Sequence, residues 1–162
     1  ITLSGHIMRK QDHSNAFEVN KNVLVIFSAP SAFVSANWYT TKNMGSTWNY
    51  QTVHARGLLE LKDETHLRNL LTDLTLYFEK DLDAPTQVKN LSKEYMEQNM
   101  KAIYSFDIVV NDLQHVFKLS QNRDEASHTN IQKELNKGDA ACKYMAAAMK
   151  AQSGPKDFHK DL

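Results

Sequence analysis

One long strand that runs directly into a helix constrains the fold of this chain more than any other feature. Residues 48–61 read as a single extended strand, in which Gly57 marks a bulge or a close approach of another backbone. Asp63 follows as an N-cap, so residues 64–80 are predicted to form a helix. The apolar face of that helix is expected to comprise Leu67, Leu70, Leu71, Leu74 and Phe78.

The residues before this strand are predicted to be mostly extended. Residues 2–8 alternate as a strand, and Asp12 is expected to cap a short helix that ends at Val19. The continuous apolar run 23–27 predicts a strand that is buried on both faces. Residues 32–36 are expected to return beside that strand as a hairpin.

The residues after the long helix mix helix and strand. Ser92 is expected to cap a helix over residues 93–100. Residues 102–110 alternate as a half-buried strand, and Asn111-Asp112 is predicted to turn the chain into a partner strand over 113–119. Two closing helices, 123–135 and 139–151, are separated at Gly138, which is expected to cap the first; the tail after Ser153 is expected to be frayed.

This order of elements favours a mainly β fold with appended helices. Strands in antiparallel hairpins, with helices inserted between them, are typical of a decorated β-barrel. We expect a barrel domain over residues 1–122 with inserted helices 64–80 and 93–100, a helical pair over 123–152 and a tail over 153–162. The chain opens on Ile1 in what reads as mid-strand, so an N-terminal part is expected to be missing.

Composition and motifs exclude several classes of function. The 19 basic residues balance the 19 acidic ones, so the chain lacks the overall field that draws proteins onto DNA. No apolar run approaches the roughly 20 residues of a membrane span. The single cysteine, Cys142, excludes an intrachain disulfide and fits a cytoplasmic location. Glycine-rich phosphate loops are absent and the histidines lack metal-ligand spacing, so no metal site is expected.

Two polar stretches remain as candidate ligand sites, and we predict that they form one site. In Thr47–Gly57, alternation places Trp48, Tyr50, Thr52, His54 and Arg56 on one face, although an amphipathic barrel wall explains the pattern nearly as well. Lys118–Arg123 is rich in donors without a local acid, and a capped helix start at Ser120 is the competing explanation. A basic excess in residues 1–57 favours a ligand that bears phosphate.

Four separated motifs resemble, in the correct order, those of the PaiB family of FMN-binding negative transcriptional regulators. The motifs are Leu3-x-Gly5-His6-Ile7-x-Arg9, Ser35-x-x-Trp38-Tyr39, Thr47-Trp48-Asn49-Tyr50 followed by Val53-His54-Ala55-Arg56-Gly57, and Lys118-Leu119-Ser120-Gln121-Asn122-Arg123. The resemblance spans residues 1–135. The chain departs from the family in lacking an N-terminal portion before Gly5 and in the loop Asn43-Met44-Gly45-Ser46.

The resemblance implies an FMN-binding split β-barrel like that of pyridoxamine 5'-phosphate oxidase, in a homodimer with the flavin at the interface. The implied flavin-binding residues are Arg9, Lys10 and Ser14, by analogy for the phosphate, together with Trp48, Asn49, Tyr50, His54, Arg56, Lys118, Ser120, Gln121, Asn122 and Arg123. Family members are described as repressors of protease and sporulation genes in some bacteria, which implies a regulator more than an enzyme. Direct DNA binding is possible but has only weak support from charge and motif. The alternative function is an FMN-dependent oxidoreductase with His54 or Tyr50 as proton donor.

Overall fold

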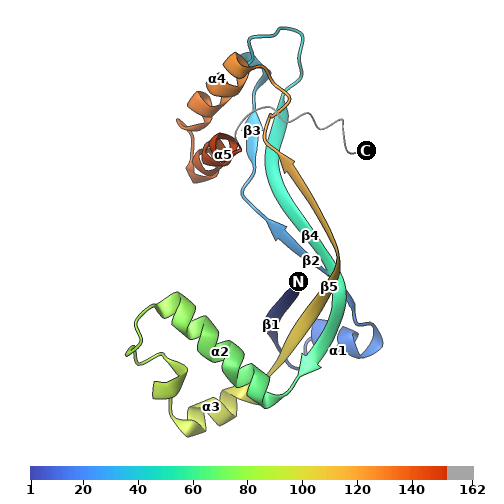
Figure 1. Cartoon of the computed structure of the whole chain (residues 1–162), viewed down its shortest axis with the longest axis vertical. Coiled ribbons are helices and arrows are strands. Elements are labelled where there is room, and N and C mark those ends of the chain that lie inside the picture. Colours follow the sequence, from blue (N-terminus) through green and yellow to red (C-terminus); the bar gives the residue numbers. More distant parts are fainter. Residues whose placement is uncertain (153–162) are drawn as a thin grey trace. The chain divides into compact units, whose positions relative to one another are not determined.

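The computed structural model describes residues 1–152 of the chain, which fall into two compact units (Figure 1). The first unit comprises residues 1–25 and 55–113, and the second comprises residues 26–54 and those from 114 onward. Five strands form a sheet in the order β1-β5-β4-β2, with β3 paired to β4 off this path. We describe each unit by itself.

The first unit joins strands to three helices. Strand β1 (Thr2–Met8) lies antiparallel to the start of β5 (Ile103–Lys118), with Gly5 opposite Phe106. Helices α1 (Asp12–Val19), α2 (Glu64–Glu79) and α3 (Lys93–Met100) and a short 3-10 turn, η2 (Val88–Asn90), complete it. A small core of Leu67, Met96 and Met100 holds α2 and α3 together.

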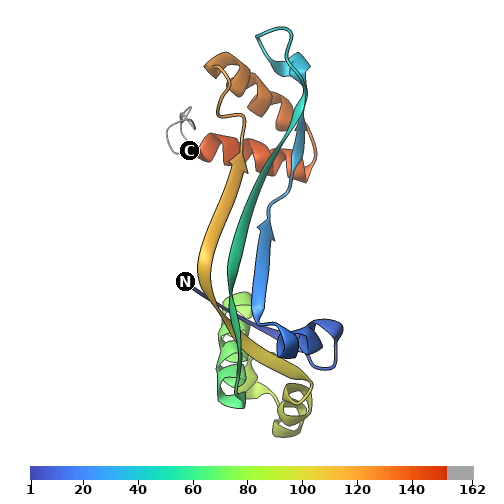
Figure 2. The same cartoon turned by 90° about the vertical axis from the view of Figure 1, so that its right-hand side faces the viewer.

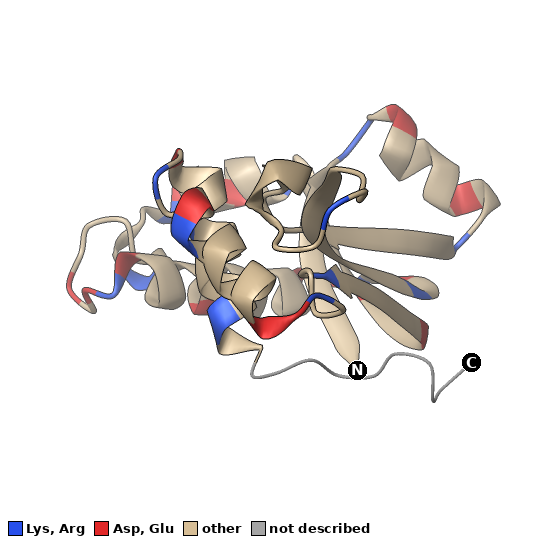
Figure 3. Cartoon of the chain, turned by 90° about the horizontal axis from the view of Figure 1, so that it is seen from above, with Lys and Arg blue, Asp and Glu red and all other residues tan. Residues whose placement is uncertain are grey.

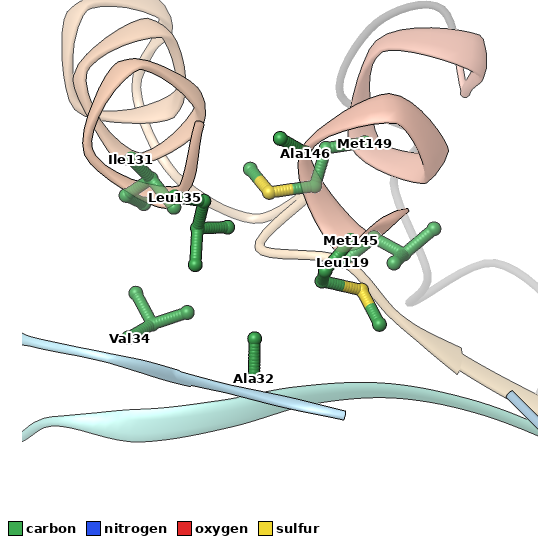
Figure 4. Packing of buried hydrophobic residues seen from close by; sticks show 8 residues of the cluster. All are labelled: Ala32, Val34, Leu119, Ile131, Leu135, Met145, Ala146 and Met149. Carbon is green, nitrogen blue, oxygen red and sulfur yellow. The ribbon is translucent and has the colours of Figure 1, made fainter. Parts of the chain in front are cut away.

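The second unit packs two helices against the start of β4 (Thr47–Lys62) and its partner β3 (Ala32–Val34). Strand β3 runs antiparallel beside β4, with Phe33 opposite Trp48, and leads into the 3-10 turn η1 (Ala36–Trp38) (Figure 2). Helices α4 (Glu125–Leu135) and α5 (Ala140–Ala151) cover them. Figure 4 shows the core of this unit, formed by Ala32, Val34, Leu119, Ile131, Leu135, Met145, Ala146 and Met149.

Several expected elements are confirmed with their local causes. Strand β4 runs unbroken, and Gly57 sits where an added Cβ would overlap the carbonyl oxygen of Val109, so another backbone does approach closely. The side chain of Asp63 accepts a hydrogen bond from the His66 N–H at 2.8 Å and caps α2. Ser92 caps α3 through the N–H of Tyr95 at 3.1 Å. These caps satisfy donors that the first helical turn leaves unpaired.

Strand β2 (Asn22–Ser28) forms as expected, but it is not buried on both faces. Leu24, Ile26 and Phe27 are 44%, 55% and 49% exposed. The apolar run therefore lies partly on the surface, where residues 1–152 of one chain do not cover it. Phe78, expected on the packing face of α2, is 70% exposed as well, because the core under α2 ends before the last turn.

The predicted hairpin between β2 and residues 32–36 is wrong, because β3 pairs with β4 instead. Pro30 has no backbone N–H to donate to a neighbouring strand. The Ala29 N–H donates instead to the carbonyl oxygen of Gln51 on β4, at 3.1 Å. The strand also stops at Val34, since Ser35 caps η1 through the N–H of Asn37.

The predicted turn at Asn111-Asp112 is also wrong, because β5 continues through it to Lys118. The side chain of Asp112 forms an ion pair with Arg56 of β4, with 3.2 Å between Oδ2 and Nη1. Asp112 thus makes a cross-strand contact, and the chain does not change direction there. Asn111-Asp112 contains no glycine, so the pair is only a weak signal for a hairpin turn.

Three helix ends differ from expectation. Gln11, not Asp12, is the N-cap of α1, and its N–H donates to Ser14 Oγ at 3.0 Å. Helix α4 begins at Glu125 under an Asp124 cap, so a helix start at Ser120 is excluded. Asn136, not Gly138, caps the other end of α4. The tail predicted after Ser153 lies outside the described residues.

Candidate functional site

Two polar stretches that are far apart in the sequence meet in the second unit. Thr47 and Asn49 lie on one face of β4, beside the chain that leaves the end of β5. Lys118 Nζ donates a hydrogen bond to Thr47 Oγ1 at 2.5 Å, and Ser120 Oγ donates to Asn49 Oδ1 at 3.0 Å. The structure therefore brings Thr47–Asn49 and Lys118–Ser120 together.

Asn49 and Ser120 form the buried part of this junction. Asn49 is 0% exposed and Ser120 is 5% exposed. The amide nitrogen of Asn49 lies 3.3 Å from the sulfur of Met149 on α5, so the Asn49 amide is engaged on both sides. Ser120 has a φ of 58°, a left-handed conformation that costs energy for a residue other than glycine. These two side chains hold the turn after β5 in place.

Gln121 closes the same turn on its own backbone. Its Oε1 accepts from the Leu119 N–H at 2.7 Å, and its Nε2 donates to the Phe117 carbonyl oxygen at 2.5 Å. Its side chain therefore fixes the path of the chain from β5 toward α4. Asn122, the next residue, is exposed.

A groove of about 510 Å³ lies beside this turn. It is lined by His115, Val116, Phe117, Lys118, Gln121, Asn122 and Gln152. The His115 and Phe117 rings lie 5.0 Å apart between centroids, at an angle of 50°. The side-chain oxygen of Gln152 is buried and accepts no hydrogen bond from the described residues. The groove thus combines the His115 and Phe117 rings, the Lys118 ammonium and side-chain amides. One of these amides, that of Gln152, has a buried oxygen without a hydrogen-bond donor among the described residues.

The charge of Lys118 at this groove has no carboxylate partner among residues 1–152, since its ammonium bonds only Thr47. Arg123 is turned elsewhere, with its guanidinium 4.3 Å from the centroid of the Tyr39 ring. The Tyr39 hydroxyl is buried, and no described group hydrogen-bonds it. Lys118 is therefore the cation available to a ligand in the groove.

Three other predicted residues lie elsewhere on β4. Trp48 and Tyr50 are 54% and 36% exposed, on the face opposite the buried Asn49. Trp48 packs edge-on against Phe33, with 5.8 Å between ring centroids. His54 is half-buried. None of the three lines the groove. Trp48 and Tyr50 of β4 and Phe33 of β3 are exposed aromatic side chains.

Four predicted residues belong to the first unit and make contacts there. Arg9 donates from Nε to the Ile103 carbonyl oxygen at 2.9 Å, with its guanidinium 4.0 Å from the centroid of the Tyr104 ring. Lys10 is exposed, at a φ of 60°. Ser14 is buried and donates to the Gln11 carbonyl oxygen at 2.8 Å. Arg56 is paired with Asp112.

Sequence reasoning missed several residues of the groove. His115 and Phe117 alternate along β5 and so share a face. Both lie within the strand predicted over residues 113–119, so alternation alone could have grouped them. Thr47 shares the face of Asn49 by the same alternation. No local signal marks Gln152, because its place depends on how α5 packs.

Ion pairs engage only some of the charged side chains among residues 1–152. Charged residues of both signs are interspersed along α2, α3 and α4 (Figure 3). In the first unit, Asp107 accepts from Ser4 Oγ at 2.6 Å and lies 3.1 Å from His66 Nε2 and 3.5 Å from Lys62 Nζ. The hydrogen bond from the Ser4 hydroxyl, and then the neighbouring His66 and Lys62 side chains, hold the pKa of the Asp107 carboxyl below its usual value. None of the described helices has the length and apolarity needed to cross a bilayer.

Comparison with known sequences identifies related proteins. A family model described as "Putative FMN-binding domain" matches residues 1–112. Over 148 residues the chain is 36% identical to "Protease synthase and sporulation protein PAI 2" of Bacillus subtilis (strain 168), covering 91% of this chain and 71% of that protein. It is 26% identical over 166 residues to an uncharacterized protein of Emericella nidulans, covering 92% of this chain and 66% of that protein.

Two solved structures are similar in fold. One is described as a putative 5-nitroimidazole antibiotic resistance protein from Bacteroides thetaiotaomicron, with a TM-score of 0.50. The aligned region covers 70% of this chain and 60% of that protein's chain. The other is an FAD and heme binding protein from Mycobacterium smegmatis, with a TM-score of 0.52 and coverages of 72% and 53%. Each is 15% identical to this chain, so the likeness concerns the fold alone. With the observed sheet, it confirms the expected split β-barrel with appended helices.

Proposed function

Because the chain belongs to the PaiB-type family whose model is described as "Putative FMN-binding domain", we propose that it binds FMN as a homodimeric transcriptional regulator. The groove beside Lys118 is the observation that carries the flavin proposal. Its volume of about 510 Å³ falls in the usual range of small-molecule sites, roughly 300–1,000 Å³. The remaining predicted contacts, from Arg9, Lys10, Ser14, Trp48, Tyr50, His54, Arg56 and Arg123, rest on the family resemblance.

The groove residues suit a planar ring that carries polar edges. The His115 and Phe117 rings offer aromatic surface, and the Lys118 ammonium offers positive charge without a competing carboxylate among residues 1–152. The unpaired oxygen of Gln152 suits a ligand N–H, since a buried acceptor without a donor is costly. A bound flavin would supply reversible electron acceptance, and the protein side chains would orient its ring.

The identity of the flavin is tested by equilibrium dialysis of the protein against FMN, FAD and riboflavin in parallel. We expect FMN to bind most tightly. Riboflavin, which lacks the phosphate, should bind at least about tenfold more weakly if one charge-assisted contact to phosphate contributes. Equal binding of all three flavins would contradict the choice of FMN. Tighter binding of FAD than of FMN would make FAD the proposed cofactor instead.

The exposed apolar side chains support a homodimer. On the strands of the second unit, these include Ile26, Phe27, Phe33, Trp48, Tyr50 and Val116; on the strands of the first unit, they include Leu24, Leu58, Val109 and Leu113. Apolar side chains gathered on a surface mark interaction sites. Light scattering during gel filtration should give twice the 18.5 kDa chain mass. A Trp48→Lys variant should shift the protein toward the monomer, and a wild-type monomer at about 50 µM would overturn this part of the proposal.

The regulatory role rests on the identity to PAI 2, and the proposal keeps the cytoplasmic location expected from the single cysteine. Direct DNA contact is tested by gel-shift titration of the promoter fragment upstream of the gene that encodes this protein, at low and at physiological salt. Binding that weakens with salt would support direct regulation. NAD(P)H-driven reduction of bound flavin, assayed in the same preparation, would instead favour an FMN-dependent oxidoreductase with His54 or Tyr50 as proton donor.

A further inference from the structure

The first unit contains a second cavity, of about 310 Å³, whose lining shares no residue with the groove beside Lys118. It lies where β1 and β4 end and where β5 begins, next to α2 and α3. Leu67 and Met100, both buried in the core, line it with Ile103. Three cations and three carboxylates make up most of the remaining wall.

Each carboxylate of the wall already has a partner. Asp63 accepts from the His66 N–H at 2.8 Å as the cap of α2. Glu64 lies 3.8 Å from Arg68, and Glu97 lies 3.7 Å from Lys93, in pairs one helical turn apart. Glu64 and Glu97 are therefore each paired with a cation on the same helix, whereas Asp63 is paired with a backbone N–H.

Of the three cations in the wall, Lys62 is paired, since its ammonium lies 2.8 Å from Glu60 and 3.5 Å from Asp107. Arg9 and Lys101 are not paired with a carboxylate among residues 1–152. Arg9 donates only from Nε, to a backbone carbonyl, and its two terminal NH₂ groups meet no acceptor among residues 1–152. The Lys101 ammonium likewise has no hydrogen bond or ion pair with another described residue. Arg9 and Lys101 thus bring positive charge to the cavity that no described carboxylate neutralises.

Arg9 is held in a way that suits the recognition of an oxyanion. The bond from Nε to Ile103 and the stacking on Tyr104 fix the plane of its guanidinium, which leaves one edge with two parallel donors. Such an edge binds two phosphate oxygens at once, and a lysine adds a point charge. We infer that this cavity binds a small phosphate-bearing molecule through Arg9 and Lys101, independently of the flavin proposed for the second unit. Arg9 then contacts this molecule in place of the flavin phosphate that the family resemblance assigns to it.

Calorimetric titration with inorganic phosphate, at constant ionic strength and with saturating FMN present, tests the inference. Phosphate should bind the wild-type protein and should bind Lys101→Gln about tenfold more weakly. Removing a negative charge from the wall with Glu97→Gln should tighten binding. Lys21→Gln, which removes an exposed charge of the same unit that does not line the cavity, should leave phosphate binding unchanged.

The competing outcomes are distinct. FMN affinity that is unchanged in Lys101→Gln, together with phosphate binding to the FMN-saturated protein, supports an independent site. Phosphate that binds only without FMN and is displaced by it would overturn the inference, because the cavity would then hold the phosphate of the flavin. Absence of phosphate binding up to about 10 mM, or an equal loss in Lys21→Gln, would overturn it as well, since a general field effect would then suffice.

Discussion

Ser120 donates a hydrogen bond to Asn49 at 3.0 Å, and this bond joins two buried residues that lie 71 positions apart. It ties the turn after β5 to the start of β4, while Lys118 reaches Thr47 two residues earlier on β4. The groove residues Lys118, Gln121 and Asn122 are therefore placed by a contact that itself does not line the groove. We propose that Asn49 and Ser120 position the groove residues for the flavin proposed above.

Asn49→Ala should destabilise the protein by about 1–3 kcal/mol, because it leaves the buried Ser120 hydroxyl unpaired. Flavin affinity should fall along with the stability. Urea denaturation and flavin titration measure the two effects. Asn122→Ala is the matched control, since Asn122 is exposed and lines the groove: it should leave the free energy of unfolding nearly unchanged. A flavin defect in Asn49→Ala at wild-type stability would show that Asn49 is a direct ligand contact.

Lys118→Gln should weaken flavin binding about tenfold without changing the free energy of unfolding. Lys118 is exposed, and its bond to Thr47 is a surface contact, so little stability depends on it. Fluorescence quenching of added FMN gives the affinity. Lys133→Gln on the exposed surface of α4 removes the same charge away from the groove. Equal losses in both variants would mean that net charge, rather than the groove, governs the affinity.

Gly57→Ala should destabilise the protein by about 1–3 kcal/mol or more, because an added Cβ overlaps the backbone carbonyl of Val109 and lies 2.7 Å from the Ile108 side chain. A backbone atom within the sheet cannot move aside as a flexible side chain can. Gly45→Ala is the control, since nothing lies within 4 Å of its added Cβ. Thermal denaturation of both variants checks the contrast, and an unchanged melting temperature for Gly57→Ala would argue against the close pairing of β4 with β5.

The sequence predicted the parts of the fold whose signals are local. Asp63 and Ser92 cap the helices that follow them, and the long strand through Gly57 was read correctly. The errors came where a distant partner decides the structure. The turn predicted at Asn111-Asp112 is a continuous strand in which Asp112 pairs with Arg56 of β4. Strand β3 pairs with β4 rather than with β2, because Pro30 lies between β2 and β3 and interrupts pairing there.

The same distinction holds at the candidate site. Alternation along β4 correctly separates Asn49 from Trp48 and Tyr50, but it does not reveal which face is buried. That face is set by Met149 of α5, 100 positions away, which contacts the Asn49 amide. His115 and Gln152 reach the groove only through the packing of β5 and α5, so a pattern of residue types could not assign them.

Ser4→Ala should reduce stability at neutral pH but not at low pH. The Ser4 hydroxyl is the main cause that holds the pKa of Asp107 below its ordinary value of 3.8. A carboxyl whose pKa is lower in the folded state contributes stability above pH 3.8, which is lost as the pH falls through the folded-state pKa. Urea denaturation should show a gap between wild type and variant at pH 6 that narrows as the pH falls below 3.8. Thr2→Ala on the same strand is the control, and a gap in Ser4→Ala that does not narrow below pH 3.8 would contradict this origin of the effect.

FMN binding by this chain is tested by titrating the flavin-free protein with FMN and recording the absorption spectrum. We expect the flavin bands to shift as a complex forms with one FMN per chain, and denaturation should release unmodified FMN into the supernatant. Lys118→Gln measured in parallel should require about ten times more FMN for half-saturation. An unshifted spectrum at tens of micromolar protein and flavin, with all FMN passing freely through a membrane that retains the protein, would contradict the account.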